Sequence, residues 1–213
     1  MNRILVYGDS LSWGIIPGTR ERLPFEKRWP GVLEIALQKK VKGFRIIENC
    51  LNGRRTVWSD PFKLGRNGSH GLAQVIEMHS PLTLVILMLG INDFQLPHNN
   101  NSYLSAQGIG KLIGIIRQAP IEPNMPVPEI LVVAPPLTKK PSGVMAIKFK
   151  NAEKCCQGLP EEMKKIAGDL SAYFYDANQV VGASEIDGIH LDQEQHFELG
   201  LAIAEKVFSI VGL

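Results

Sequence analysis

Short apolar runs rich in β-branched residues alternate along the chain with longer segments of helical period. Two runs, Leu84–Leu89 and Ile130–Val133, are continuous in hydrophobicity instead of alternating, which is typical of strands buried on both faces. The apolar runs together predict five strands, at Arg3–Tyr7, Phe44–Ile47, Leu82–Leu89, Ile130–Ala134 and Tyr173–Tyr175.

Segments with helical spacing of apolar residues lie between these runs. One opens at Pro30, because proline suits the first turn of a helix, and Ser102 is expected to cap a second. A third covers about 146–170 and should break near Gly158-Leu159-Pro160, and a last one covers 192–211. Such alternation predicts an α/β fold, in which helices cover both faces of a five-stranded parallel sheet.

Nothing in the sequence divides the 213 residues, so one domain over 1–213 is expected, long enough to bury a full core. Three segments rich in proline, glycine and charge predict surface loops, at 17–27, 120–128 and 135–143. Loops 17–27 and 135–143 either close over a site as a lid or contact a second copy of the chain as a homo-oligomer. Both alternatives stay open.

Composition excludes several classes of protein. Apolar residues make up 45% of the chain and charged residues 21%, which is typical of a globular protein and not of a disordered one. A formal net charge of +2 gives no reason to expect a nucleic-acid or membrane partner. The longest apolar stretch is too short for a membrane span, and no secretory segment is recognisable. Three cysteines, two of them adjacent, argue against disulfides and favour a cytoplasmic protein.

Small and polar residues follow most of the predicted strands. In open parallel sheets, ligands bind beyond the carboxyl ends of the strands. There the chain carries Gly8-Asp9-Ser10, Asn52-Gly53-Arg54, Gly90-Ile91-Asn92-Asp93 and, beyond the last strand, Asp187-Gly188-Ile189-His190. This distribution indicates one site at this edge of the sheet.

Ser10, His190 and Asp187 are the residue types of a catalytic triad. A serine hydroxyl becomes nucleophilic when a base takes its proton, and a carboxylate can hold that base in place. Asp187 and His190 are three residues apart, so both side chains can point the same way. Taken alone, Ser10 suits a helix cap and His190 a surface histidine, but neither interpretation explains why all these groups follow strands.

An acyl-transfer site also needs N–H donors for the developing oxyanion. The candidates are the side-chain amide of Asn92 and the backbone N–H groups of Gly53 and Ser10. Asn92 equally suits an Asn-Asp turn and Gly53 an Asn-Gly turn, so these residues alone leave both interpretations open. Trp13 and Ile15 are candidates for an acyl-pocket wall, or for packing of the first loop. Asp93 is expected to structure the loop that holds Asn92.

The four blocks together resemble those of the GDSL, or SGNH, hydrolases, in the order of that family and over residues 8–190. The segments 9–14, 28–33 and 187–190 are most similar to bacterial arylesterase and acyltransferase members. The resemblance implies a flavodoxin-like sandwich with sheet order 2-1-3-4-5, Ser10 as nucleophile, His190 as base and Asp187 as its orienter. It also implies Ser10, Gly53 and Asn92 as oxyanion donors. The second block departs from the pattern: Glu48 replaces the asparagine of many members, and Arg54-Arg55 follow the glycine.

The leading prediction is therefore a serine esterase for small acetyl, aryl or short-acyl esters, working through an acyl-enzyme with water or an alcohol as acceptor. The alternative is a phosphate- or nucleotide-binding module built on Gly8–Gly14, although the phosphate-loop and dinucleotide motifs are absent. An α/β-hydrolase is disfavoured because no Gly-x-Ser-x-Gly occurs. No cofactor is expected, and no metal either, because His70, His79, His98 and His196 lack ligand spacing. Cys50 is expected to be a buried small hydrophobe.

Overall fold

A parallel sheet lies at the centre of the computed structural model, which describes residues 2–98 and 100–212. The strands pair in the order β2-β1-β3-β4-β5, all in parallel, so the predicted five strands and their order are confirmed. The middle strand β3 is buried along its whole length, which explains its unbroken hydrophobicity. The strands are β1 (Asn2–Gly8), β2 (Phe44–Cys50), β3 (Leu84–Met88), β4 (Glu129–Ala134) and β5 (Tyr173–Asp176).

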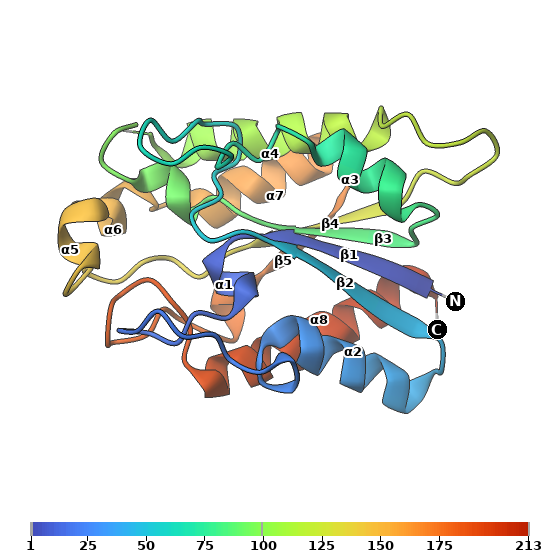
Figure 1. Ribbon diagram of the computed structural model, residues 1–213, viewed down its shortest axis with the longest axis horizontal. Coiled ribbons are helices and arrows are strands. Elements are labelled where there is room, and N and C mark those ends of the chain that lie inside the picture. Colours follow the sequence, from blue (N-terminus) through green and yellow to red (C-terminus); the bar gives the residue numbers. More distant parts are fainter. Residues whose placement is uncertain (1, 99, 213) are drawn as a thin grey trace.

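Helices cover both faces of the sheet, which confirms the predicted three-layer α/β/α sandwich (Figure 1). Helices α3, α4 and α7 lie on one face, and α2 and α8 pack together on the other. The larger helices are α2 (Trp29–Lys40), α3 (Leu72–His79), α4 (Ser102–Arg117), α7 (Leu159–Asp169) and α8 (Gln193–Val211). Among the described residues, no helix is both long enough and apolar enough to cross a membrane.

Short helices gather where the strands end. In Figure 1, β1 runs from the N-terminus towards α1, and α5 and α6 lie beyond the same end of the sheet. A short helix at a strand end turns the chain back over the sheet within a few residues, so it brings polar side chains to this edge. These elements are α1 (Ser10–Trp13), η1 (Phe25–Lys27), η2 (Ile91–Phe94), α5 (Met145–Lys148), α6 (Ala152–Cys155) and η3 (Ala177–Gln179).

The helices differ from prediction in three places. The segment 146–170 breaks at Gly158 as expected, but also before α6, where Asn151 adopts a left-handed conformation that a helix does not continue. The cap of α4 is Asn101, whose side chain accepts from the N–H of Leu104, and not Ser102. Helix α3 was not predicted, because its short segment buries only Leu72 and Ile76.

Loop 135–143 was expected at the surface, and only part of it lies there, since residues 139, 140 and 143 are exposed. Pro135, Pro136, Thr138 and Pro141 are all buried. The loop lies against the segment that carries Asp187, because the N–H of Lys139 donates to Gly188 O and the N–H of Ser142 donates to Asp187 O. Loops 17–27 and 120–128 are mostly exposed, as expected.

Candidate active site

Ser10 begins the single turn of α1, directly after β1. Asp9 caps this turn, because its carboxylate accepts from the N–H of Leu11 at 2.9 Å. The carboxyl end of β1 therefore fixes where Ser10 lies. Its side chain is buried, with 6% of its surface exposed, so only a small opening gives solvent access to the hydroxyl.

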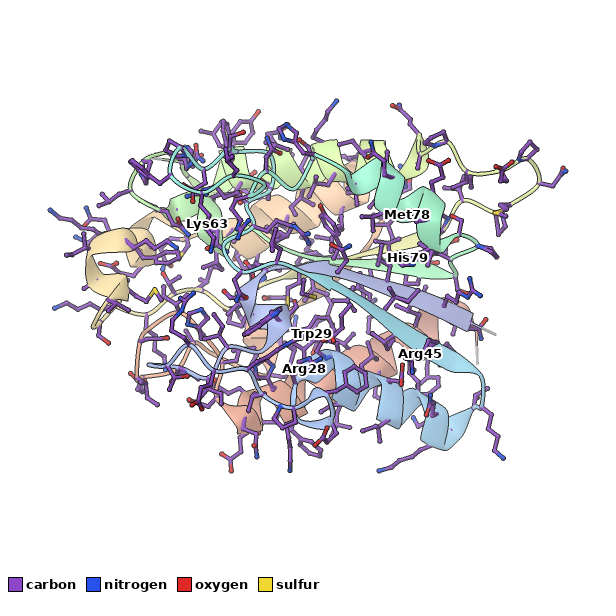
Figure 2. The ribbon with its side chains drawn as sticks, in the orientation of Figure 1. Arg28, Trp29, Arg45, Lys63, Met78 and His79 are labelled. Atoms are coloured by element: carbon purple, nitrogen blue, oxygen red, sulfur yellow. The ribbon has the colours of Figure 1, made fainter. Side chains whose placement is uncertain are left out.

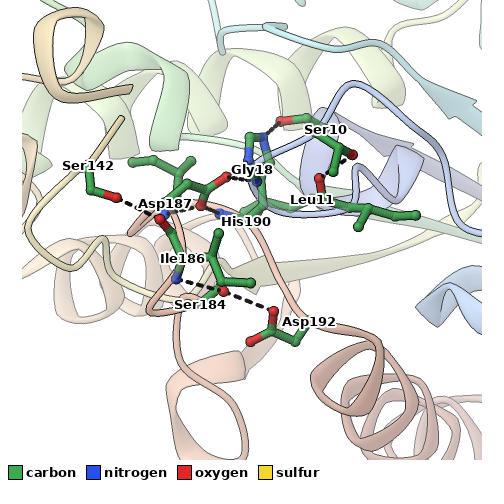
Figure 3. Close-up of polar contacts among 12 residues, drawn as sticks. Ser10, Leu11, Gly18, Ser142, Ser184, Ile186, Asp187, His190 and Asp192 are labelled. Carbon is green, nitrogen blue, oxygen red and sulfur yellow. Dashed lines mark hydrogen bonds and ion pairs between the residues drawn. The ribbon is translucent and has the colours of Figure 1, made fainter. Parts of the chain in front are cut away.

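Ser10, His190 and Asp187 form a continuous hydrogen-bonded row (Figure 3). Nε2 of His190 lies 3.1 Å from Oγ of Ser10, and Nδ1 of His190 lies 2.6 Å from Oδ2 of Asp187. Burial alone would raise the pKa of Asp187, but the hydrogen bond and charge of His190 outweigh it and bring the pKa to about 2. Asp187 is therefore a carboxylate throughout the neutral range, and it holds Nδ1 as the protonated nitrogen.

Two loops support the Asp187 segment from opposite sides. Oδ1 of Asp187 accepts from the N–H groups of Ile189 and His190, which closes the segment on itself. The N–H of Gly18 reaches Oδ2 at 3.4 Å, and the hydroxyl of Ser142 donates to Ile186 O at 2.6 Å (Figure 3). Parts of loops 17–27 and 135–143 thus contribute directly to the position of the imidazole.

The amide of Asn92 is held on two sides. Its Nδ2 donates to Oδ2 of Asp9 at 2.8 Å, and its Oδ1 accepts from Nε2 of Gln95 at 2.6 Å. One N–H of the amide remains for a ligand. Burial raises the pKa of Asp9 to about 6, against the lowering effect of Leu11 N–H, His190 and Asn92. Asp9 was predicted only as a member of the first block and Gln95 not at all, since no spacing rule marks either residue as a support for Asn92.

Asp93 connects the segment after the second block (52–54) to the third block (90–93) by hydrogen bonds. Its carboxylate accepts from the N–H and the hydroxyl of Thr56 and from the hydroxyl of Ser105, at 2.7–2.9 Å. Burial raises the pKa of Asp93 to about 6 despite these bonds. The side chain is completely buried, so it structures the loops instead of facing a substrate. The expected structural role of Asp93 agrees with these contacts.

Gly53 lies three residues before Thr56, at a positive φ of 81° that favours glycine. Neither Gly53 nor Ser10 uses its N–H in a hydrogen bond with another described residue. Ser10, Gly53, Asn92 and His190 line one cleft of about 50 Å³. The structure therefore brings the predicted nucleophile, base and oxyanion donors together.

Ile15 lines the same cleft, but Trp13 does not. The ring of Trp13 instead lies under the guanidinium of Arg22, at 4.6 Å from the ring centroid, and its carbonyl accepts from Arg22 Nε. Of the two alternatives for Trp13, a pocket wall or packing of the first loop, these contacts agree with packing of the first loop. The cleft is also lined by Asn52 from the second block. Further lining residues were not predicted, and they are Arg20, Asp60, Lys63, Met145, Lys148 and Phe149.

The departures in the second block have structural roles. Glu48 accepts two hydrogen bonds from the guanidinium of Arg28, which anchors the start of α2 to β2. Arg54 donates to Gly8 O at 3.0 Å and to Asn49 Oδ1 at 2.8 Å, and its guanidinium stacks on Tyr7. These contacts hold the ends of β1 and β2 together beside Ser10.

Other candidate chemistries find less support at this site. Burial raises the pKa of the Cys50 thiol, which disfavours a thiolate nucleophile. Within 2–98 and 100–212, no three His, Cys, Asp or Glu side chains lie close enough to hold a metal. The alternative of an anion-binding module is disfavoured, because α1 is a single turn whose N-terminus already faces the carboxylate of Asp9.

The family model of GDSL-like lipases and acylhydrolases matches residues 6–197, which is most of the chain. The chain belongs to the GDSL-like lipase/acylhydrolase family. This match confirms the resemblance found in the four sequence blocks. At the level of the family, the predicted class of GDSL/SGNH-type carboxylic ester hydrolases is also confirmed.

Solved structures of family members are similar over the whole chain. A carbohydrate acetylesterase from Sinorhizobium meliloti superposes with a TM-score of 0.92 at 35% identity, covering 99% of this chain and 100% of its own. The inhibitor-bound M. smegmatis aryl esterase gives a TM-score of 0.93 at 31% identity, covering 98% and 99%. An arylesterase from Vibrio mimicus is 34% identical over 91 residues, which is 43% of this chain and only 38% of that relative.

Proposed function

We propose that this family member is a serine esterase that hydrolyses short-acyl esters through an acyl-enzyme on Ser10. The observation that carries the proposal is the row from Ser10 Oγ to His190 Nε2 and from His190 Nδ1 to Asp187, in one cleft with Asn92 and Gly53. The acetylesterase and aryl esterases among its similar structures support the same class of substrate.

In the first half-reaction, Oγ of Ser10 attacks the ester carbonyl while its proton passes to Nε2 of His190. The carbonyl oxygen becomes an oxyanion, which the N–H groups of Ser10 and Gly53 and the amide of Asn92 stabilise. His190 then returns the proton to the departing alkoxide, and the alcohol leaves. In the second half-reaction, water gives a proton to Nε2 of His190 and attacks the acyl carbonyl. His190 then returns the proton to Oγ of Ser10, the bond between Oγ and the acyl carbon breaks, and the acid leaves.

The size of the cleft supports a short acyl group. Its volume of about 50 Å³ is far below the few hundred Å³ of pockets that enclose drug-sized ligands. Acetyl is the acyl group that this space suits best. Since Ser10, Asn92 and His190 are all buried, an alcohol can compete with water for the acyl-enzyme, and we include acyl transfer in the proposal. Adding ethanol during phenyl acetate turnover should then give ethyl acetate at the expense of acetate.

The test of the nucleophile uses phenyl acetate with the parent, Ser10→Ala and the matched control Ser12→Ala. Ser12 lies on the same turn, is buried and makes no hydrogen bond to a described residue, so its hydroxyl has no part in the mechanism. Ser10→Ala should lose hydrolysis while Ser12→Ala keeps it, and mass spectrometry should find the acetyl group on Ser10. An acetyl group on Cys50, or full activity in Ser10→Ala, contradicts the proposal.

A further inference from the structure

Three cations line the cleft that holds Ser10. They are Arg20 from the first loop, Lys63 from the loop after β2 and Lys148 from the end of α5. Lys63 lies at the end of the molecule where α5 and α6 are found (Figure 2). The three come from segments far apart in sequence, so the fold, and not a local run of charge, brings them to the site.

Within 2–98 and 100–212, these cations have no acidic or hydrogen-bonding partner, and Lys148 contacts only the face of the Phe149 ring, 5.7 Å from its centroid. Neither the guanidinium of Arg20 nor the ammonium groups of Lys63 and Lys148 form an ion pair or a hydrogen bond there. Asp60 is the acidic residue that lines the cleft, but its carboxylate is paired with Arg55 at 2.7 Å. The charge of Asp60 is therefore already compensated, and the cleft keeps an excess of positive charge.

The three cations act on one another. Burial lowers the pKa of Lys148 first, and Arg55, Lys63 and Arg20 lower it further, with only Asp60 opposing them. The whole chain carries a formal net charge of only +2, so three uncompensated cations at one opening are a local concentration of charge. Like charges held together without counter-charges favour binding of an anion between them.

A wider cavity adjoins this cleft. Asp60, Lys63 and Lys148 also line a neighbouring cavity of about 540 Å³, whose remaining lining includes Phe62, Leu96 and Pro97. Lys63 and Lys148 therefore stand between the small space beside Ser10 and a larger, partly apolar space. With a short acyl group beside Ser10, the alcohol part of an ester extends past these two ammonium groups.

We propose that Arg20, Lys63 and Lys148 form an anion subsite that selects short-acyl esters whose alcohol part carries a negative charge, such as a carboxylate. This inference rests on the proposed esterase function and adds the substrate class. An aromatic or aliphatic body would lie against Phe62 and Leu96, with its anionic group between the lysines. Neutral esters are still substrates, but they do not use the subsite.

The test compares para-acetoxybenzoate with para-acetoxybenzamide, two acetyl esters of the same shape that differ by one negative charge. Each kcat/KM is divided by the hydroxide-catalysed rate of the same ester, which removes the intrinsic difference in reactivity. Each exposed cation should contribute roughly 1.4- to 5-fold, so the anionic ester should be preferred by about 10-fold in dilute buffer. The preference should shrink in strong salt, where the Debye length falls to about 3 Å.

The variants are Lys63→Gln, Lys148→Gln and the triple change that adds Arg20→Gln, with Lys111→Gln as the matched control. Lys111 is exposed on α4, outside both cavities, and its change removes the same unit of charge. The preference should fall in each single variant, approach unity in the triple variant and stay at the parent value in Lys111→Gln.

If the parent enzyme hydrolyses para-acetoxybenzamide through Ser10 but shows no preference for para-acetoxybenzoate, the proposal of an anion subsite is wrong. The proposed esterase function is unaffected by that result. A preference that survives in the triple variant overturns the assignment to these cations. Failure of the esterase itself looks different, because both esters would then remain unhydrolysed or their hydrolysis would not depend on Ser10.

Discussion

The side chain of Asn92 illustrates how a catalytic donor is prepared for its role. Asp9 and Gln95 bind its amide from two sides, so its orientation is fixed before substrate arrives. Asn92→Ala should therefore lower kcat by about 10²–10³-fold, the loss typical of one oxyanion donor, with a smaller effect on KM. Steady-state kinetics on phenyl acetate measure both constants. A change confined to KM would mean that Asn92 only positions the ester.

Asp187 offers a second test at the level of one side chain. Its Oδ1 accepts two backbone N–H groups while Oδ2 faces Nδ1 of His190. In Asp187→Asn, the amide oxygen should keep the two backbone bonds, so the NH₂ group faces Nδ1 and drives the proton to Nε2. The imidazole then cannot accept the proton of Ser10, and kcat/KM should fall by up to about 10⁴-fold. Activity close to the parent's would show that another group orients His190.

At the level of elements, α4 supports the oxyanion loop from behind. A Cβ on Gly108 would lie 2.1 Å from Oγ1 of Thr56, whose hydroxyl and N–H both bind Asp93. Gly108→Ala should therefore displace the segment that carries Gly53, lowering both the free energy of unfolding and kcat. The matched control is Gly114→Ala on the same helix, where a Cβ would meet nothing within 4 Å.

Gly114→Ala should raise the free energy of unfolding by up to about 1 kcal/mol, because alanine is the better helix former, and should leave kcat unchanged. Urea unfolding and phenyl acetate kinetics on both variants make the comparison. Equal behaviour of the two variants would mean that α4 does not hold the loop through Thr56.

The sequence predicted those elements whose signal is local. The continuous runs of β3 and β4 identify the central strands, and four blocks at strand ends identify Ser10, Asn92 and the Asp187 segment. The side chains that depend on tertiary partners were missed. Gln95 matters only because Arg55 and Asn92 meet there, and Lys148 reaches the cleft only because α5 folds over the sheet edge.

The burial of four residues in loop 135–143 was not predicted, and two alternatives for Trp13 stayed open, for the same physical reason. Proline-rich composition shows that a segment is irregular, but not what covers it, and here the Asp187 segment covers it. An aromatic residue beside the nucleophile suits a pocket wall equally well until its stacking partner, Arg22, is known.

For the whole molecule, buried titratable groups determine how stability varies with pH. His196 on α8 is completely buried and accepts from the N–H of Trp29 at 3.3 Å, which joins α8 to the start of α2. Burial lowers the pKa of His196 to about 3, and the charges of His190 and Arg28 add to this. Asp9 and Asp93 have the opposite property, since burial raises the pKa of each to about 6.

On the acid side, Asp9 and Asp93 change the free energy of unfolding in one direction and His196 changes it in the other. Between about pH 6 and pH 4, the folded chain binds protons at Asp9 and Asp93 that the unfolded chain does not, so these groups stabilise it as the pH falls. His196 acts the other way, because below the ordinary histidine pKa of 6.5 the unfolded chain binds a proton that the folded chain does not. The parent's stability on the acid side is the difference between these contributions.

Replacing His196 isolates its contribution to the pH dependence of stability. In His196→Gln the free energy of unfolding, compared with the parent at the same pH, should rise as the pH is lowered from 6.5 to 4.5, by up to roughly 1.4 kcal/mol per pH unit. The comparison cancels Asp9 and Asp93, which both proteins share, and it holds even if the variant is less stable at neutral pH because its cavity is imperfectly filled. His70→Gln is the matched control, since it makes the same change at an exposed histidine. Urea unfolding at several pH values measures the slope. A flat difference for His196→Gln would mean that this imidazole takes up a proton in the folded protein, and therefore that α2 and α8 admit a charge between them.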